Sequence, residues 1–255
     1  MTIETVLFLV SIGLFGGAWN ALAGGATLFT FPALMAAGLP PVVANATNYL
    51  ALLPSNAAAL PAYRRELAGV GAAIWPLIAI SGLGAIAGSV LLLYSGENLF
   101  EALIPALVLL ATALFAFGER IRTVMVAGLK GASTGLLLYA ALFVFSIYGG
   151  YFGAGLGIIL LAIVQIMGFS SFHVANSLKN LLATSFTILS IGVFGLSGLI
   201  AWPEAMVVMC GSTLGGYFGA RWARSVNERY LRAAVICFGV TLAGVYVAKA
   251  FNLWA

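Results

Sequence analysis

Two short groups of polar side chains, each carried on an apolar segment, are the residues that could bind a ligand. Asn45 and Asn48 form the first group, and Asn176, Ser177 and Lys179 form the second. Asn45 and Asn48 are three positions apart, as are Asn176 and Lys179, so each pair shares one face of a helix. Amide N–H groups and a lysine ammonium are hydrogen-bond donors that suit an oxyanion. If the two groups converge, they predict a site for a small anion.

A cluster of glycines precedes each polar group. Gly24 and Gly25 stand before the first, and Gly155 and Gly157 stand before the second. Glycine lets a ligand approach the backbone closely, and a helix N-terminus carries about half a positive charge together with unpaired N–H donors. We therefore expect the glycines to form a backbone cradle for the anion, with Lys179 as its charge partner. The predicted substrate-binding residues are Gly24, Gly25, Thr27, Asn45, Asn48, Gly155, Gly157, Asn176, Ser177 and Lys179.

Each of these residues also has a common structural role in membrane helices. Glycines let helices pack closely, and Asn or Ser side chains hydrogen-bond across helix interfaces. Lys179 stands early in its apolar segment, so its ammonium could reach the membrane surface instead. His173, at a turn, is a candidate for proton linkage or for a structural contact, and Tyr148 and Tyr151 could line a cavity. The sequence leaves both sets of roles open.

The two groups are parts of an internal duplication. Val43–Asn48 is similar to Val174–Lys179, and each follows a glycine cluster and a short apolar stretch. Trp75-Pro76 is likewise matched by Trp202-Pro203, each followed by a pair of glycines. Duplicated halves, helices broken by glycine and polar residues inside apolar segments are together typical of a secondary transporter.

The composition places the chain in a membrane. Hydrophobic residues make up 63% of it and charged residues 7%, against about 45–50% and 25% in soluble domains. The net charge of +4 does not indicate nucleic-acid binding, because the basic residues are scattered at segment ends. We expect one integral membrane domain over 1–255, with the lipid bilayer and a small anion as its partners. Whether two copies pair as a homodimer stays open.

Near-continuous apolar runs predict an all-α polytopic fold rather than a barrel. Segments 26–37 and 156–168 are too short to span a bilayer, which takes about 20 residues. Fusing each short segment to the one before it gives eight conventional transmembrane helices, four plus four. Treating 26–61 and 156–198 as glycine-broken re-entrant hairpins leaves three full spans per half, and an odd number inverts the second half. The predicted segments are 3–21, 26–37, 42–61, 70–94, 98–117, 124–148, 156–168, 172–198, 202–222 and 229–250.

The arginines favour the inverted arrangement. Lys and Arg gather on the cytoplasmic side of membrane proteins. With re-entrant hairpins, all three arginine groups lie on that side and both termini lie outside, whereas with eight spans the last group falls opposite the others. We therefore predict an inverted repeat, with halves 1–118 and 124–255 joined by a cytoplasmic linker, 119–123. The arginine groups are Arg64 and Arg65, then Arg120 and Arg122, then Arg221, Arg224, Arg229 and Arg232.

The sequence lacks the signatures of enzymes and of ATP-driven pumps. It contains no Asp, and its Glu residues lie at or near segment ends, so no carboxylate is placed for the usual proton or Na⁺ relay. No Walker motif or HExxH is present, and the single His leaves little for a metal site or a catalytic triad. We therefore expect no catalysis, no cofactor and no metal. The membrane potential, or proton linkage through His173 or Lys179, is the expected driving force.

The residues Gly24-Gly25, Phe31–Leu34, Gly38–Pro40, Val43–Asn48 and Tyr63–Arg65 form a pattern that resembles the TauE/SafE family of sulfite and sulfonate exporters. The second half shows a similar pattern, so the resemblance covers nearly the whole chain. It implies a multi-pass transporter of a bacterial or archaeal inner membrane, which exports a sulfur-containing anion such as sulfite or sulfoacetate. Members serve several anions, so an importer of a related anion and an anion channel both stay open.

Overall fold

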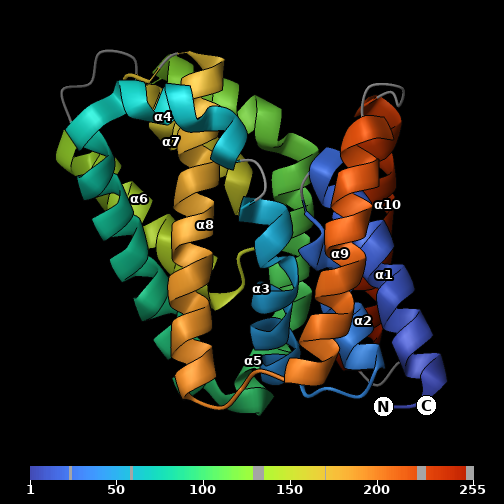
Figure 1. Ribbon diagram of the computed structural model, residues 1–255. Coiled ribbons are helices and arrows are strands. Elements are labelled where there is room, and N and C mark those ends of the chain that lie inside the picture. The colour runs from blue at the N-terminus through green and yellow to red at the C-terminus, as the bar shows by residue number, and fades with distance from the viewer. Residues whose placement is uncertain (23–24, 58–59, 129–134, 170, 223–227, 251–255) are drawn as a thin grey trace.

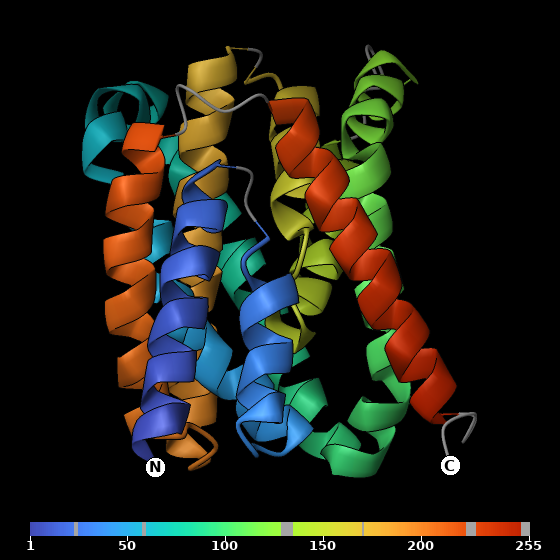
Figure 2. The ribbon, with the colours of Figure 1, turned by 90° about the vertical axis from the view of Figure 1, so that its right-hand side faces the viewer.

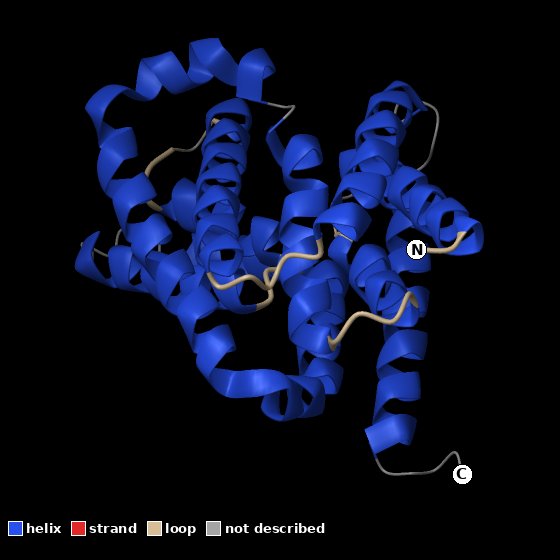
Figure 3. Ribbon diagram, turned by 60° about the horizontal axis from the view of Figure 1, so that its bottom comes forward, coloured by secondary structure: helices blue, strands red, loops and turns tan. Residues whose placement is uncertain are grey.

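The computed structural model describes residues 1–22, 25–57, 60–128, 135–169, 171–222 and 228–250. Within these ranges every regular element is a helix (Figure 3). Two short 3-10 helices, Leu60–Tyr63 and Gly71–Ala73, flank α4. The α-helices are α1 (Ile3–Leu22), α2 (Thr27–Ala36), α3 (Pro41–Ala57), α4 (Arg64–Val70), α5 (Ile74–Gly128), α6 (Gly135–Tyr151), α7 (Leu156–Ile166), α8 (Phe172–Leu196), α9 (Trp202–Trp222) and α10 (Glu228–Ala250).

The chain is an all-α polytopic membrane protein. Three stretches of the described helices, Ile3–Asn20, Arg64–Ala127 and His173–Leu196, are long and apolar enough to cross a bilayer. Large apolar side chains point outward along the helices, and those of Leu136 and Leu196 are 85% and 93% exposed. Lipid is the solvent that such a surface requires.

The helix ends follow the predicted segments closely, except around α5. Segments 70–94 and 98–117 lie in one helical run that bends sharply at Gly96, where φ is 68°. Glycine adopts a positive φ without steric cost, so the chain reverses there without a loop. The linker predicted at 119–123 is helical and continues α5. The predicted segment 124–148 therefore began too early, because 124–128 still belong to α5 and α6 starts at Gly135.

The helices run alternately up and down between two ends of the molecule (Figures 1 and 2). The turn between α2 and α3 lies at the lower end, beside the start of α1, whereas the turn between α7 and α8 lies at the upper end. The two hairpins thus point in opposite directions. α4, the last part of α5, the end of α9 and the start of α10 lie at the upper end, and these elements carry the arginines that the structure describes. This course supports the inverted repeat, which stays a prediction.

Three glycine turns recur in the two halves with nearly the same φ angle. The φ angles are 80° at Gly25 and 77° at Gly155, 99° at Gly38 and 105° at Gly168, and 63° at Gly71 and 70° at Gly198. The first pair precedes the short helices α2 and α7, the second ends them, and the third precedes the helices that begin near Trp75 and Trp202. The glycines of the duplicated sequence therefore place equivalent turns at equivalent points of each half.

Two helix pairs pack backbone to backbone, and each pair joins one half to the other. A Cβ atom on Gly17 of α1 would overlap the carbonyl of Ser212 in α9, and one on Gly88 of α5 would overlap the carbonyl of Ile147 in α6. Small residues allow such approach, which supplies most of the packing energy between membrane helices. The first helix of each predicted repeat is therefore held by the other repeat.

Candidate functional site

The short helices α2 and α7 begin against the same turn of α5. A Cβ atom on Gly155, just before α7, would lie 3.2 Å from Cβ of Leu114 and 3.3 Å from the carbonyl oxygen of Ala111. A Cβ atom on Gly25, just before α2, would overlap the ring of Phe115. Both glycine turns thus contact residues 111–115 of α5. Two helix starts that are far apart in the sequence are held against the same turn of one helix.

Neither N-terminus carries a side-chain cap. The residues at the cap positions are Ala26 for α2 and Gly155 for α7, and neither residue makes a side-chain capping hydrogen bond to its helix. The positive end of each helix dipole is therefore left to other groups, and an anion is the ligand that it favours.

Lys179 lies beside the start of α7. A Cβ atom on Gly157 would be 3.7 Å from Cδ of Lys179, in ordinary van der Waals contact. The lysine is half-buried, and within the part of the chain that the structure describes it has no carboxylate partner. An unpaired ammonium inside a membrane protein is costly, so such residues usually serve a ligand or an ion pathway. Lys179 and the α7 N-terminus offer one positively charged corner.

The first polar group turns toward the short helices. Asn48 Nδ2 donates to Thr27 Oγ1 over 3.3 Å, and Asn48 Oδ1 lies within hydrogen-bond distance of Thr30 Oγ1. Asn45 Nδ2 donates to the carbonyl oxygen of Tyr151 over 2.9 Å, across the two halves. Asn45 is fully buried, and its Oδ1 has no partner among the described residues. Thr27 and Asn48 thus stand together at the start of α2, while Asn45 lies at the end of α6.

In the second polar group, Asn176 and Ser177 make different kinds of hydrogen bond. Asn176 Nδ2 donates to the hydroxyl oxygen of Tyr63 over 2.8 Å, so this amide also contacts the other half. Ser177 Oγ donates to the carbonyl of Val174 in its own helix over 2.7 Å. His173 is exposed near the start of α8. Gly24 lies outside the described residues, and the binding role of every residue in this set stays a prediction.

Three side chains of the first half hydrogen-bond to the end of α6. The residue spacing in the sequence did not reveal them as a group. The last carbonyls of that helix accept hydrogen bonds from Tyr49, Ser89 and Asn45: Gly149 O from the Tyr49 hydroxyl, Gly150 O from Ser89 Oγ at 3.3 Å, and Tyr151 O from the Asn45 amide at 2.9 Å. A helix end leaves carbonyls unsatisfied, and lipid cannot satisfy them. The first half therefore stabilises the helix break of the second half.

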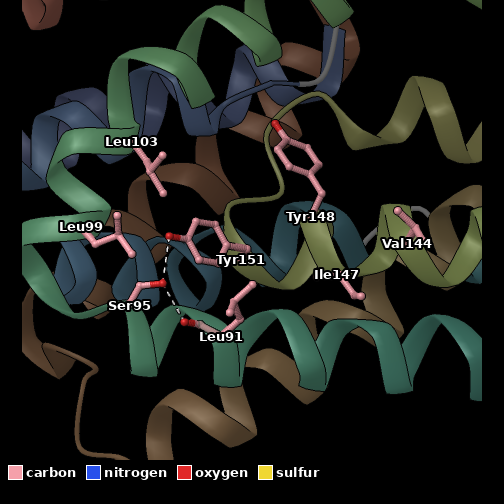
Figure 4. Close-up of a pocket in the computed structure, with 8 residues that line it drawn as sticks. All are labelled: Leu91, Ser95, Leu99, Leu103, Val144, Ile147, Tyr148 and Tyr151. Carbon is pink, nitrogen blue, oxygen red and sulfur yellow. Dashed lines mark hydrogen bonds between the residues drawn. The ribbon is translucent and has the colours of Figure 1, made fainter.

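A groove of about 440 Å³ lies beside this break (Figure 4). Tyr148 and Tyr151 line it, as predicted, and the Tyr151 hydroxyl bonds to Ser95 Oγ over 3.1 Å. Its remaining lining is aliphatic, from Leu91, Leu99, Leu103, Val144 and Ile147. Such a lining offers almost nothing to an anion, so this groove does not correspond to the anion site predicted from the polar residues.

A polytopic helical protein with two glycine-broken helices, both held against one turn of α5 and one of them beside a half-buried lysine, has the organisation of a secondary membrane transporter. The family model described as "Sulfite exporter TauE/SafE" matches residues 9–247, and the chain belongs to this family.

The chain is also similar to several curated proteins. It is 31% identical over 238 residues to a "Probable membrane transporter protein" of Haemophilus influenzae, covering 92% of this chain and 91% of that protein. It is 30% identical over 236 residues to the "Probable membrane transporter protein YfcA" of Escherichia coli K12, and the match covers 91% of this chain and 84% of that protein. Identity to the "Probable membrane transporter protein ORF9" of a Sinorhizobium species is 26% over 245 residues, covering 95% and 92%. No solved structure gave a significant match.

Proposed function

We propose that this membrane transporter exports a small sulfur-containing oxyanion, such as sulfite, sulfoacetate or a related sulfonate, by alternating access. The observation that carries the proposal is that the starts of α2 and α7, neither of which has a side-chain cap, both contact one turn of α5, with Lys179 beside Gly157. The family description supports the sulfur anion and the outward direction.

The chemistry of the site suits a compact oxyanion. Helix N-termini contribute partial positive charge and fixed N–H donors, and Lys179 contributes a full charge on a flexible stem. The charge is lopsided, because Asn48 stands in the first half at the position equivalent to Lys179. One full charge flanked by neutral donors balances a single anionic group, and the several oxygens of a sulfite or sulfonate can each accept a hydrogen bond.

The membrane potential is sufficient to drive export of such an anion. Moving one negative charge out of a cell with a negative interior is favourable by about 2.3 kcal/mol per 100 mV. Movement of the two hairpins, α2–α3 and α7–α8, against the helix pairs α1–α9 and α5–α6 would expose the site alternately to the two sides. In this proposal the glycine turns before α2 and α7, where φ is positive, are the joints at which the hairpins would move.

The test is anion flux in proteoliposomes. Sulfite and sulfoacetate are offered to the wild type and to the variants Lys179→Ala, Lys179→Arg and Arg120→Ala. We expect Lys179→Ala to lower the flux at least about tenfold, since a charged hydrogen bond to the anion is lost. Lys179→Arg keeps the charge and should retain part of the flux. Arg120 is exposed at the upper end of α5, so Arg120→Ala controls for loss of a positive charge elsewhere. Wild-type flux in Lys179→Ala would refute the proposed site.

A further inference from the structure

Tyr63 occupies an unusual place between the two halves. It is the last residue of the 3-10 helix Leu60–Tyr63, which with α4 packs against α8 of the other half. Its half-buried hydroxyl oxygen accepts a hydrogen bond from Asn176 Nδ2 over 2.8 Å. Asn176 lies one helical turn before Lys179, so the two side chains share a face of α8. Tyr63 is therefore brought to the positively charged corner by the opposite half of the chain.

The direction of this hydrogen bond leaves a donor without an acceptor. A tyrosine hydroxyl can accept one hydrogen bond and still donate its own proton. Among the described residues, no acceptor lies within hydrogen-bond distance of that proton. The Asn176 amide likewise has a second N–H beyond the one that Tyr63 accepts. Two neutral donors thus stand about one helical turn from Lys179 along α8.

Other tyrosines in the same region behave differently. Tyr148 donates its hydroxyl to the carbonyl of Ala154 over 2.7 Å, and Tyr49 donates to the carbonyl of Gly149. Both therefore satisfy backbone groups near the helix break, as structural tyrosines do. Tyr63 instead accepts from a side chain and stabilises no carbonyl. Its hydroxyl can therefore fix the position of the Asn176 amide and still donate its proton to a ligand.

We propose that Tyr63 is a further residue of the anion site, which fixes the orientation of the Asn176 amide and donates its own hydroxyl proton to a bound oxyanion. The inference rests on the proposed function. Accepting a hydrogen bond polarises the O–H group and strengthens it as a donor. Two neutral donors beside one ammonium select for an anion with at least two acceptor oxygens on one centre, which sulfite and sulfonates share and halides lack.

The test compares Tyr63→Phe, which removes only the hydroxyl, with Tyr94→Phe, whose ring is 85% exposed and serves as the matched control. Sulfite, sulfoacetate and chloride fluxes are measured over a range of concentrations. In Tyr63→Phe we expect the half-saturating concentration of the oxyanions to rise about tenfold, with the maximal flux within about twofold of wild type. The preference for oxyanions over chloride should fall to a similar extent. Tyr94→Phe should change none of these quantities.

A second variant tests the coupling between the two residues. If Tyr63 acts partly by holding Asn176, the two substitutions should not be additive. The double variant Tyr63→Phe with Asn176→Leu should then have nearly the same half-saturating oxyanion concentration as Asn176→Leu alone. The inference is overturned if Tyr63→Phe leaves the half-saturating concentration unchanged, or if it lowers maximal flux and melting temperature together with no change in anion preference. If Tyr63→Phe transports the oxyanions like the wild type while Lys179→Ala abolishes flux, the inference fails and the proposed function stands. If both variants transport like the wild type, the proposed site itself fails.

Discussion

Gly155 and Gly157 stand two residues apart and have different physical roles. Gly155 has φ 77° and touches Leu114, so a side chain there is both strained and crowded. Gly157 is helical, and a methyl group would meet only Cδ of Lys179 at 3.7 Å. The first glycine is required by the backbone, whereas the second leaves space next to the helix start. Only the second can therefore be altered without disturbing the fold.

A pair of alanine variants separates these two roles. Gly155→Ala should destabilise the protein by at least about 1–2 kcal/mol, because an L-residue at positive φ is strained. Gly157→Ala should leave the melting temperature in detergent within about 2 °C of wild type, since Ala favours a helix over Gly. It should nevertheless raise the half-saturating anion concentration, because the methyl group shields the backbone N–H groups. An unchanged anion affinity in Gly157→Ala would argue against a backbone cradle at α7.

The helical placement of the candidate residues could be predicted from the sequence, but their hydrogen-bond partners could not. The three-residue spacing placed Asn45 and Asn176 on helix faces, as their helices confirm. Their hydrogen-bond partners, Tyr151 and Tyr63, are 106 and 113 residues away. Helical periodicity reports only local neighbours, so it indicates which residues could bind but not which are already engaged. Ser177 illustrates this, because its hydroxyl already donates a hydrogen bond to the carbonyl of Val174 in its own helix.

At the scale of the elements, the glycine pairs that follow each Trp-Pro motif explain why the helices pack so closely. Gly84 and Gly88 face α6, and Gly211 and Gly215 face α1. The sequence revealed these glycines as a repeat, and their positions predicted the helix ends well because Gly and Pro interrupt helices. It could not reveal that α5 continues through Gly96, since an apolar run on both sides of a glycine is equally compatible with a loop.

A single methyl group should separate α5 from α6. In Gly88→Ala the new Cβ atom would overlap the carbonyl oxygen of Ile147, so the helices must move apart and lose contacts. We expect a loss of about 1–3 kcal/mol, typical of overpacking. The matched control is Gly192→Ala in α8, where nothing lies within 4 Å of an added Cβ atom. Thermal unfolding in detergent measures both variants. Equal melting temperatures would show that the α5–α6 contact is looser than described.

At the scale of the whole molecule, the two close helix pairs connect the halves at two places. α1 of the first half is held by α9 of the second, and α6 of the second half is held by α5 of the first. This exchange leaves the hairpins α2–α3 and α7–α8 between two pairs that small residues hold together. If the protein works by alternating access, as proposed above, the two close pairs would form the frame against which the hairpins move.

The orientation of the halves can be tested by labelling one cysteine at a time, after Cys210 and Cys237 are replaced by Ala. Ala68 in α4 and Ser197 after α8 are both exposed, and their segments lie at opposite ends of the molecule (Figure 1). With an inverted repeat, a membrane-impermeant maleimide added to whole cells should label Ser197→Cys, whereas Ala68→Cys should react only after permeabilisation. The arginines of α4 predict that its side is cytoplasmic. With eight conventional spans, four plus four, the two positions would face the same side and react alike. Opposite labelling would therefore exclude the parallel arrangement, and identical labelling would exclude the inverted one.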